Sequence, residues 1–249
     1  MPFSKTLLAL LLLAFCPVLH AADQRTPYEA SLFDESRRRE IPLLIYSARA
    51  GKDATRLALI SGGNGMPPSA YGFIARKLVD EGYLVVGVQH QLPADAPLAM
   101  VGDLYALRKP TWERGVANLR FVISTLRRDF PRLDESRTIL IGHSNGGDIS
   151  ALFATLYPKE IAAVITLDHR RMPIPRTRQP RFLSLRADEF PSDPGVLPSP
   201  DEAKNLGISV VPLKNAKHIE LSDQGSDELK ERVCGLISEF LGEPTPATN

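Results

Sequence analysis

The chain has 249 residues, of which 43% are hydrophobic and 24% charged. This balance is typical of one ordinary globular domain with a sizeable core. Its 30 basic and 29 acidic residues nearly cancel, which argues against nucleic acid as a partner, because binding to phosphates needs an excess of positive charge.

The N-terminus has the features of a secretory signal peptide. Lys5 is followed by an apolar run over 6–19 and then by small residues. We expect residues 1–21 to be removed on export to the periplasm or the medium, which leaves a single domain over 22–249. A membrane anchor is the alternative, but the run is short for a bilayer crossing and no second one follows.

Short apolar strands then alternate with amphipathic helices. This pattern predicts a mostly parallel central sheet with helices on both faces. The polar segment 22–39 and the tail 243–249 are expected to be loose. In chain order we expect strands over 41–47 and 56–61, a helix over 71–82, a strand over 83–89, a helix over 112–130, a strand over 138–142, a helix over 148–157, strands over 161–167, 181–187 and 208–213, and a helix over 227–242.

A serine stands between glycines where the buried strand 138–142 ends. Residues 142–146 read Gly-His-Ser-Asn-Gly, the G-x-S-x-G pattern, between an expected strand and an expected helix. A nucleophilic serine must project from a tight turn, and the glycines leave room for neighbouring backbone. The alternative is that Ser144 only caps the helix, but its place after a buried strand favours a nucleophile.

The same turn directs the first amides of the helix toward Ser144, so the backbone N–H of Asn145 can donate to an oxyanion. The glycine-rich stretch 59–65 follows an earlier strand. We expect the N–H of Gly63 to be the second donor. These glycines can instead serve only to permit positive φ angles in a loop.

A serine hydroxyl needs a base, and histidine is the usual one. After residue 21 the chain has His90, His143, His169 and His218, and only His218 follows the last expected strand. Its loop lies at the same edge of the sheet as Ser144, so we predict His218 as the base. His90 and His143 are candidates for substrate binding, although the side chain of His143 must point away from Ser144 on the sharp turn, which favours a structural hydrogen-bonding role for it.

Three carboxylates can orient His218. Asp188 and Asp193 follow the strand 181–187, and Asp168 ends the preceding strand. Asp193 is preferred because its Pro/Gly-rich loop can lean toward the histidine. Asp188 is the first alternative and Asp168 the second, since a triad is defined by its geometry.

The stretches LISGGNG (59–65), IGHSNGG (141–147) and KHIE (217–220), with the acid loop, resemble the α/β-hydrolase superfamily over 41–241. DESRRREIPLLIYSA (34–48) is similar to the start of small esterases of the dienelactone hydrolase and platelet-activating-factor acetylhydrolase-like branches. The dienelactone enzymes use a cysteine nucleophile where this chain has a serine. Their particular substrate therefore does not carry over.

The resemblance implies an acyl-enzyme cycle. Ser144 attacks a carbonyl with His218 as base, amides of Gly63 and Asn145 hold the oxyanion, and water releases the acid. We therefore expect a serine hydrolase that cleaves small or medium carboxylic esters and needs no cofactor or metal. The alternatives are a thioesterase or amidase of the same fold, or a non-catalytic hydrolase-like binding protein.

The segment 168–180 is short and interrupted by prolines, so we expect no large cap domain and an open pocket. It carries four arginines, which either attract an anionic substrate or are simply solvated. They are Arg170, Arg171, Arg176 and Arg178.

Overall fold

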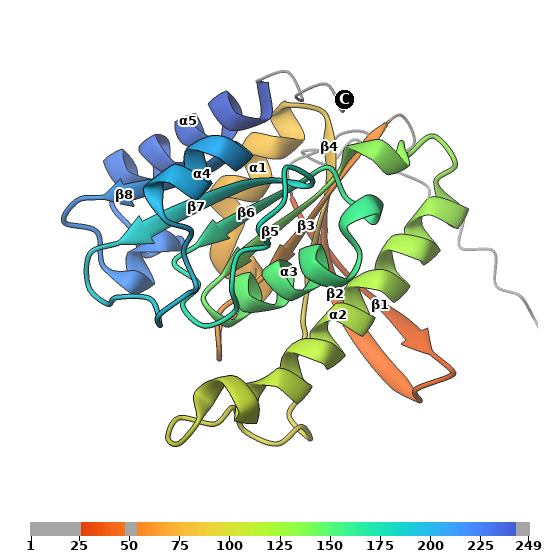
Figure 1. Cartoon of the computed structure of the whole chain (residues 1–249). Helices are drawn as coiled ribbons and strands as arrows, with labels where there is room; N and C mark the ends of the chain where they lie inside the picture. Colours follow the sequence, from red (N-terminus) through yellow and green to blue (C-terminus); the bar gives the residue numbers. More distant parts are fainter. Residues whose placement is uncertain (1–25, 48–53, 243–249) are drawn as a thin grey trace, which may run out of the picture.

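A computed structural model describes residues 26–47 and 54–242 (Figure 1). The expected signal peptide and the tail 243–249 lie outside these residues. The strands are β1 (Tyr28–Asp34), β2 (Arg39–Tyr46), β3 (Arg56–Ser61), β4 (Tyr83–Val88), β5 (Thr138–His143), β6 (Ala163–Leu167), β7 (Arg181–Ala187) and β8 (Ile208–Leu213). The helices are α1 (Gly72–Asp80), α2 (Leu104–Asp129), α3 (Asn145–Leu156), α4 (Pro200–Leu206) and α5 (Asp227–Gly242).

All eight strands form one sheet in the order β1-β2-β4-β3-β5-β6-β7-β8. From β4 to β8 neighbouring strands are parallel, whereas β1 and β2 form an antiparallel edge. The predicted mostly parallel sheet is therefore confirmed. The carboxyl ends of the parallel strands lie at one edge of the sheet. Ser144, Asp168 and His218 each follow one of these strands.

The sheet separates two hydrophobic cores. On β3, Leu59 belongs to the core under α2 and α3, and the next residue, Ile60, belongs to the core under α1 and α5. Both residues are fully buried, as expected for a central strand covered on both faces. Figure 1 shows these helices on the two sides of the sheet. Within the described residues, no helix is long and apolar enough to span a membrane.

The expectation that 22–39 is loose is wrong for β1. This strand pairs with β2 along its whole length, and the carboxylate of Asp34 accepts a hydrogen bond from the backbone N–H of Ser36 in the connecting turn. An exposed edge strand lacks the apolar alternation that marks a half-buried one. Its pairing was therefore not visible in the sequence.

Two helical segments also escaped prediction. Helix α2 begins at Leu104, eight residues before the expected start, because the Asp103 carboxylate caps it by accepting from Ala106 N at 3.1 Å. Pro110 lies inside this helix without ending it. Helix α4 is short and begins with a capping box formed by Ser199 and Glu202.

Helix α3 leaves β5 so close to β3 that side chains at the turn are excluded. A Cβ on Gly146 would lie 2.1 Å from the carbonyl oxygen of Ser61, and one on Gly142 would lie 2.3 Å from the carbonyl oxygen of Gly146. Both obstacles are backbone atoms, which cannot move aside like a flexible side chain. The structure therefore confirms the steric reason given for the glycines of G-x-S-x-G.

Gly146→Ala is expected to lower the free energy of unfolding by about 1–3 kcal/mol or more, because the added methyl group overpacks the β3–α3 contact. Urea denaturation measures the change. Gly235→Ala is the matched control, since Gly235 lies in α5 with no atom within 4 Å of the added Cβ. The control should gain roughly 0.5–1 kcal/mol from helix propensity. Equal stability of Gly146→Ala and the parent would contradict this steric account.

Candidate active site

Ser144 sits in a strained turn between β5 and α3. Its φ of 51° and ψ of −118° lie outside the regions that L-residues usually adopt. The backbone over-determines this conformation, because Ser144 N–H donates to the carbonyl of Leu167 on β6 and Ser144 C=O accepts the N–H of Asp148 on α3. The turn places a partly exposed hydroxyl at the carboxyl end of the sheet.

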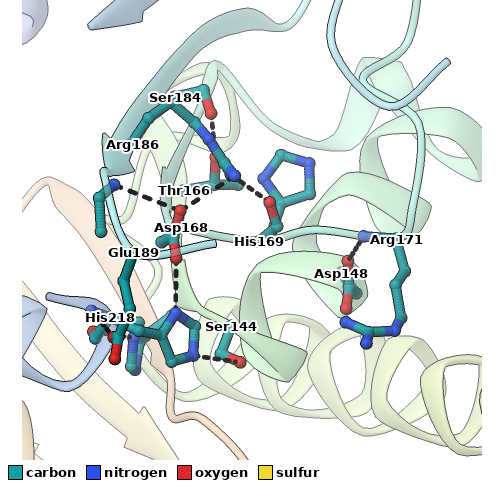
Figure 2. Close-up of polar contacts among 12 residues, drawn as sticks. Ser144, Asp148, Thr166, Asp168, His169, Arg171, Ser184, Arg186, Glu189 and His218 are labelled. Carbon is teal, nitrogen blue, oxygen red and sulfur yellow. Dashed lines mark hydrogen bonds and ion pairs between the residues drawn. The ribbon is translucent and has the colours of Figure 1, made fainter. Parts of the chain in front are cut away.

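His218 lies between this hydroxyl and a carboxylate. Its Nε2 is 3.0 Å from Ser144 Oγ and its Nδ1 is 2.6 Å from Oδ2 of Asp168. Figure 2 shows the three side chains in line. The serine follows β5, the aspartate follows the neighbouring strand β6, and the histidine lies in the loop after β8. The structure thus brings together the predicted nucleophile and base.

The carboxylate of Asp168 is fixed by strand β7. It is fully buried, at 0% exposure, and its Oδ1 accepts from Arg186 Nη2 at 3.0 Å and from Ala187 N at 3.3 Å. Arg186 also donates to the carbonyl of His169. Burial lowers the pKa of this guanidinium, and Asp168 is its main opposing charge. One oxygen of Asp168 is therefore held by β7 while the other faces His218 (Figure 2).

The preference for Asp193 as the orienting acid is corrected by this geometry. Asp193 shapes its own loop, with its N–H donating to Arg170 and its C=O accepting from Val196. Asp188 accepts from Asn215 N through its carboxylate and so ties together the loops after β7 and β8. The proline-rich composition of the loop does not predict where the side chain of Asp193 points. The position of Asp168 follows from the fold, because β6 lies beside β5 and runs parallel to it.

The two other histidines proposed for substrate binding are buried instead. His90 is 8% exposed and its Nε2 lies 2.9 Å from Ser61 Oγ. His143 is 1% exposed, and both of its ring nitrogens have protein partners. Burial lowers the pKa of each to about 3, so both stay neutral at neutral pH. The structure therefore does not place either ring at an open substrate pocket, and His143 has the buried hydrogen bonds that a structural role requires.

The expected oxyanion donors differ in their surroundings. Asn145 is the first residue of α3, whose first amides have no acceptor within the helix. Its side-chain oxygen accepts from Trp112 Nε1 at 2.8 Å, which anchors the turn to α2. The N–H of Gly63, by contrast, donates to the hydroxyl of Tyr71 at 2.9 Å. The N–H of Gly63 therefore already has an acceptor within the protein and does not point into an open oxyanion site.

The arginines after Asp168 divide into two kinds. Arg176 donates to backbone carbonyls including Ile174 and Leu197, which gives it a structural role. Among the described residues, the guanidinium groups of Arg170 and Arg171 have no carboxylate within 4 Å. Arg170 instead stacks on Phe190, with its guanidinium carbon 4.7 Å from the ring centroid.

Asp148 joins the segment after β6 to helix α3. Its Oδ1 accepts from the backbone N–H groups of Arg171 and Met172 at 3.0 and 2.9 Å (Figure 2). Burial raises its pKa to about 6. Within the described ranges, no three His, Cys, Asp or Glu side chains are grouped so that they could hold a metal ion.

Solved structures resemble this chain over most of its length. A ferulic acid esterase from Streptomyces cinnamoneus has a TM-score of 0.63 at 16% identity, over 92% of this chain and 94% of that one. Esterase 2 of Thermogutta terrifontis, phosphorylated by paraoxon, has a TM-score of 0.64 at 12% identity, over 90% and 96%. A Klebsiella pneumoniae protein assigned as a dienelactone hydrolase has a TM-score of 0.59 at 14% identity, over 88% and 100%.

No protein-family model matches the chain, and no curated protein matches it. The likeness to solved structures shows that the chain has the α/β-hydrolase fold. The resemblance stated from the sequence is thus confirmed for the fold. The connection from β6 to β7 contains no helix, as expected for a member of this fold without a large cap in that segment.

Asp168→Asn is expected to lower kcat for an ester substrate by roughly 10³–10⁴-fold, because an amide no longer fixes the tautomer of His218 or stabilises its protonated form. Asp193→Asn and Asp188→Asn should each retain activity within a few-fold. Steady-state kinetics on the three variants measures the difference. A larger loss of kcat for Asp193→Asn than for Asp168→Asn would identify Asp193 as the acid that orients His218.

Proposed function

We propose that this protein is a serine hydrolase that cleaves carboxylic esters through an acyl-enzyme on Ser144. The observation that carries the proposal is the unbroken hydrogen-bonded line from Ser144 Oγ through His218 to the buried carboxylate of Asp168. A serine hydroxyl is a weak nucleophile unless a base takes its proton, and this line provides the base and its orientation.

The geometry supports a two-step cycle. As Ser144 Oγ attacks the ester carbonyl, its proton passes to His218 Nε2, and the negative charge on the carbonyl oxygen is stabilised by the N–H of Asn145 and the N-terminus of α3. The intermediate collapses when the alcohol leaves with the proton from His218. Water then loses a proton to His218 and attacks the acyl-enzyme, and His218 returns that proton to Ser144 Oγ as the bond to the acyl group breaks and the acid is released.

The solved neighbours support an ester substrate, since two of them are named as esterases and one of these two is phosphorylated by an organophosphate. Thioesters and amides are close chemical alternatives for the same machinery. A non-catalytic binding protein is disfavoured because a purely structural role does not require the in-line arrangement of Ser144, His218 and Asp168.

A fluorophosphonate probe tests the proposal directly. The purified protein is expected to be labelled at Ser144 and to hydrolyse a p-nitrophenyl ester, and Ser144→Ala should lose both the label and at least about 10³-fold of kcat. Peptide mass spectrometry locates the label. Absence of labelling together with no turnover of esters, thioesters or amides would instead favour the binding-protein alternative.

We further infer that the substrate carries an anionic group. The guanidinium of Arg170 stacks on Phe190, and the centroid of this ring lies 6.2 Å from that of His218, so Arg170 and the proposed base pack against the same aromatic ring. Arg108 is 6% exposed, and its charge interacts with those of Arg170 and Arg171. Asp148 and Asp193 offset part of this positive charge, and the remainder favours a substrate with a carboxylate near the scissile ester.

Arg170→Gln is expected to lower the preference for a carboxylate-bearing ester roughly fivefold, which corresponds to about 1 kcal/mol for a partly exposed ion pair. The measurement is the ratio of kcat/KM for mono-p-nitrophenyl succinate to that for p-nitrophenyl butyrate. Arg178→Gln, an exposed arginine of the same loop, is the control and should leave the ratio unchanged. An unchanged ratio in Arg170→Gln would show that this arginine is simply solvated.

A further inference from the structure

A buried chain of hydrogen bonds links the glycine loop after β3 to the backbone of the proposed base. The N–H of Gly63 donates to the Tyr71 hydroxyl at 2.9 Å, and that hydroxyl lies 2.8 Å from His143 Nδ1. At the other side of the ring, His143 Nε2 lies 3.0 Å from the carbonyl oxygen of His218. Tyr71 is fully buried and His143 is almost so.

The direction of every bond in this chain follows from the chemistry of its groups. A carbonyl oxygen only accepts, so Nε2 of His143 carries the ring proton and donates to His218. In the neutral ring Nδ1 is then the acceptor, and the Tyr71 hydroxyl donates to it while accepting from Gly63. The sulfur of Met66, 3.3 Å from the same hydroxyl, is a much weaker acceptor.

Burial keeps the protonation states of His143 and Tyr71 fixed around neutral pH, and with them the directions of the hydrogen bonds. It lowers the pKa of His143 to about 3 and raises that of Tyr71 above its ordinary value. Neither group therefore changes protonation near neutral pH. The rings of His143 and His218 also pack together with their centroids 4.7 Å apart, so a charged His143 would oppose proton uptake by His218.

We propose that Tyr71 and His143 are positioning residues for the proposed ester hydrolysis, holding the glycine loop 62–66 and the His218 loop at a fixed spacing around Ser144. His143 precedes Ser144 in the chain, Tyr71 precedes α1, and His218 follows β8. The chain of bonds thus joins three segments that are far apart in sequence. His143 is the first variable residue of the G-x-S-x-G motif. The motif therefore supplies this link as well as the nucleophile.

A competing possibility makes the opposite prediction. If the N–H of Gly63 must leave Tyr71 in order to bind the oxyanion, the tyrosine hydroxyl opposes catalysis, and its removal should accelerate the reaction. If the chain positions the loops, removal should slow the reaction, because a misplacement of about 1 Å lowers rates by up to about 100-fold. The sign of one change in rate therefore separates the two.

The test compares Tyr71→Phe with Tyr83→Phe on the full chain. Tyr83 is also a buried tyrosine, but it begins β4, at the opposite end of the sheet from Ser144. The measurements are kcat and KM for p-nitrophenyl butyrate, the rate of fluorophosphonate labelling and the thermal midpoint. Tyr71→Phe should lower kcat and the labelling rate by roughly 10–100-fold with KM within about twofold, whereas Tyr83→Phe should leave all three kinetic values unchanged.

Variants of His143 extend the test. His143→Gln retains an amide that can donate toward His218 and accept from Tyr71, so it should keep more activity than His143→Leu. Because the two residues act through one chain, Tyr71→Phe combined with His143→Leu should lose no more rate than His143→Leu alone. Should the leucine variant fail to fold, Tyr71→Phe, which keeps the ring, still decides.

The inference is overturned if Tyr71→Phe matches the parent in rate, if it is faster, or if only its thermal midpoint falls. It depends on the proposed function, but the two failures are distinguishable. A parent protein that is neither labelled at Ser144 nor active on esters refutes the ester hydrolase proposal. A labelled parent with an unaffected Tyr71→Phe variant refutes only the positioning role.

Discussion

The buried ion pair between Asp168 and Arg186 is the interaction on which the rest of the site depends. A carboxylate with no exposure to solvent is strongly destabilised unless a positive charge and hydrogen-bond donors compensate it. Arg186 supplies the charge from β7 and Ala187 supplies a backbone donor. With Oδ1 occupied in this way, Oδ2 is left to accept from His218, and the orientation of the imidazole follows.

This dependence explains why the site spans so much of the sheet. The serine comes from the end of β5, the acid from β6, its counter-charge from β7 and the base from the loop after β8. Parallel strands end at a common edge, so four neighbouring strands deliver these groups without a long excursion of the chain. The close contact between Gly146 and the carbonyl of Ser61 then sets the distance of α3 from β3.

The sequence was sufficient where a role is fixed by local sterics. Ser144 could be found because a strand, a glycine-flanked turn and a helix follow one another, and His218 because it alone follows the last strand. Asp168 was ranked last because its role depends on Arg186, 18 residues away on another strand, and a local pattern carries no information about that pairing. Arg186 near the end of the buried strand β7 was the available signal, since a buried arginine requires a partner.

The histidines show how burial divides roles among chemically identical side chains. His90, His143 and His169 are each less than a tenth exposed, and burial lowers the pKa of all three to about 3. His218 has a side chain that is 19% exposed and faces a hydroxyl on one side and a carboxylate on the other.

A buried imidazole that stays neutral can serve as a fixed donor and acceptor, because its hydrogen-bond pattern does not change with pH. An imidazole that exchanges protons needs instead a solvent-accessible position and a counter-charge that stabilises its protonated form. Within residues 26–47 and 54–242, only His218 meets both conditions. The surrounding neutral histidines allow proton transfer to be confined to this one ring, since a second protonated imidazole nearby would oppose it electrostatically.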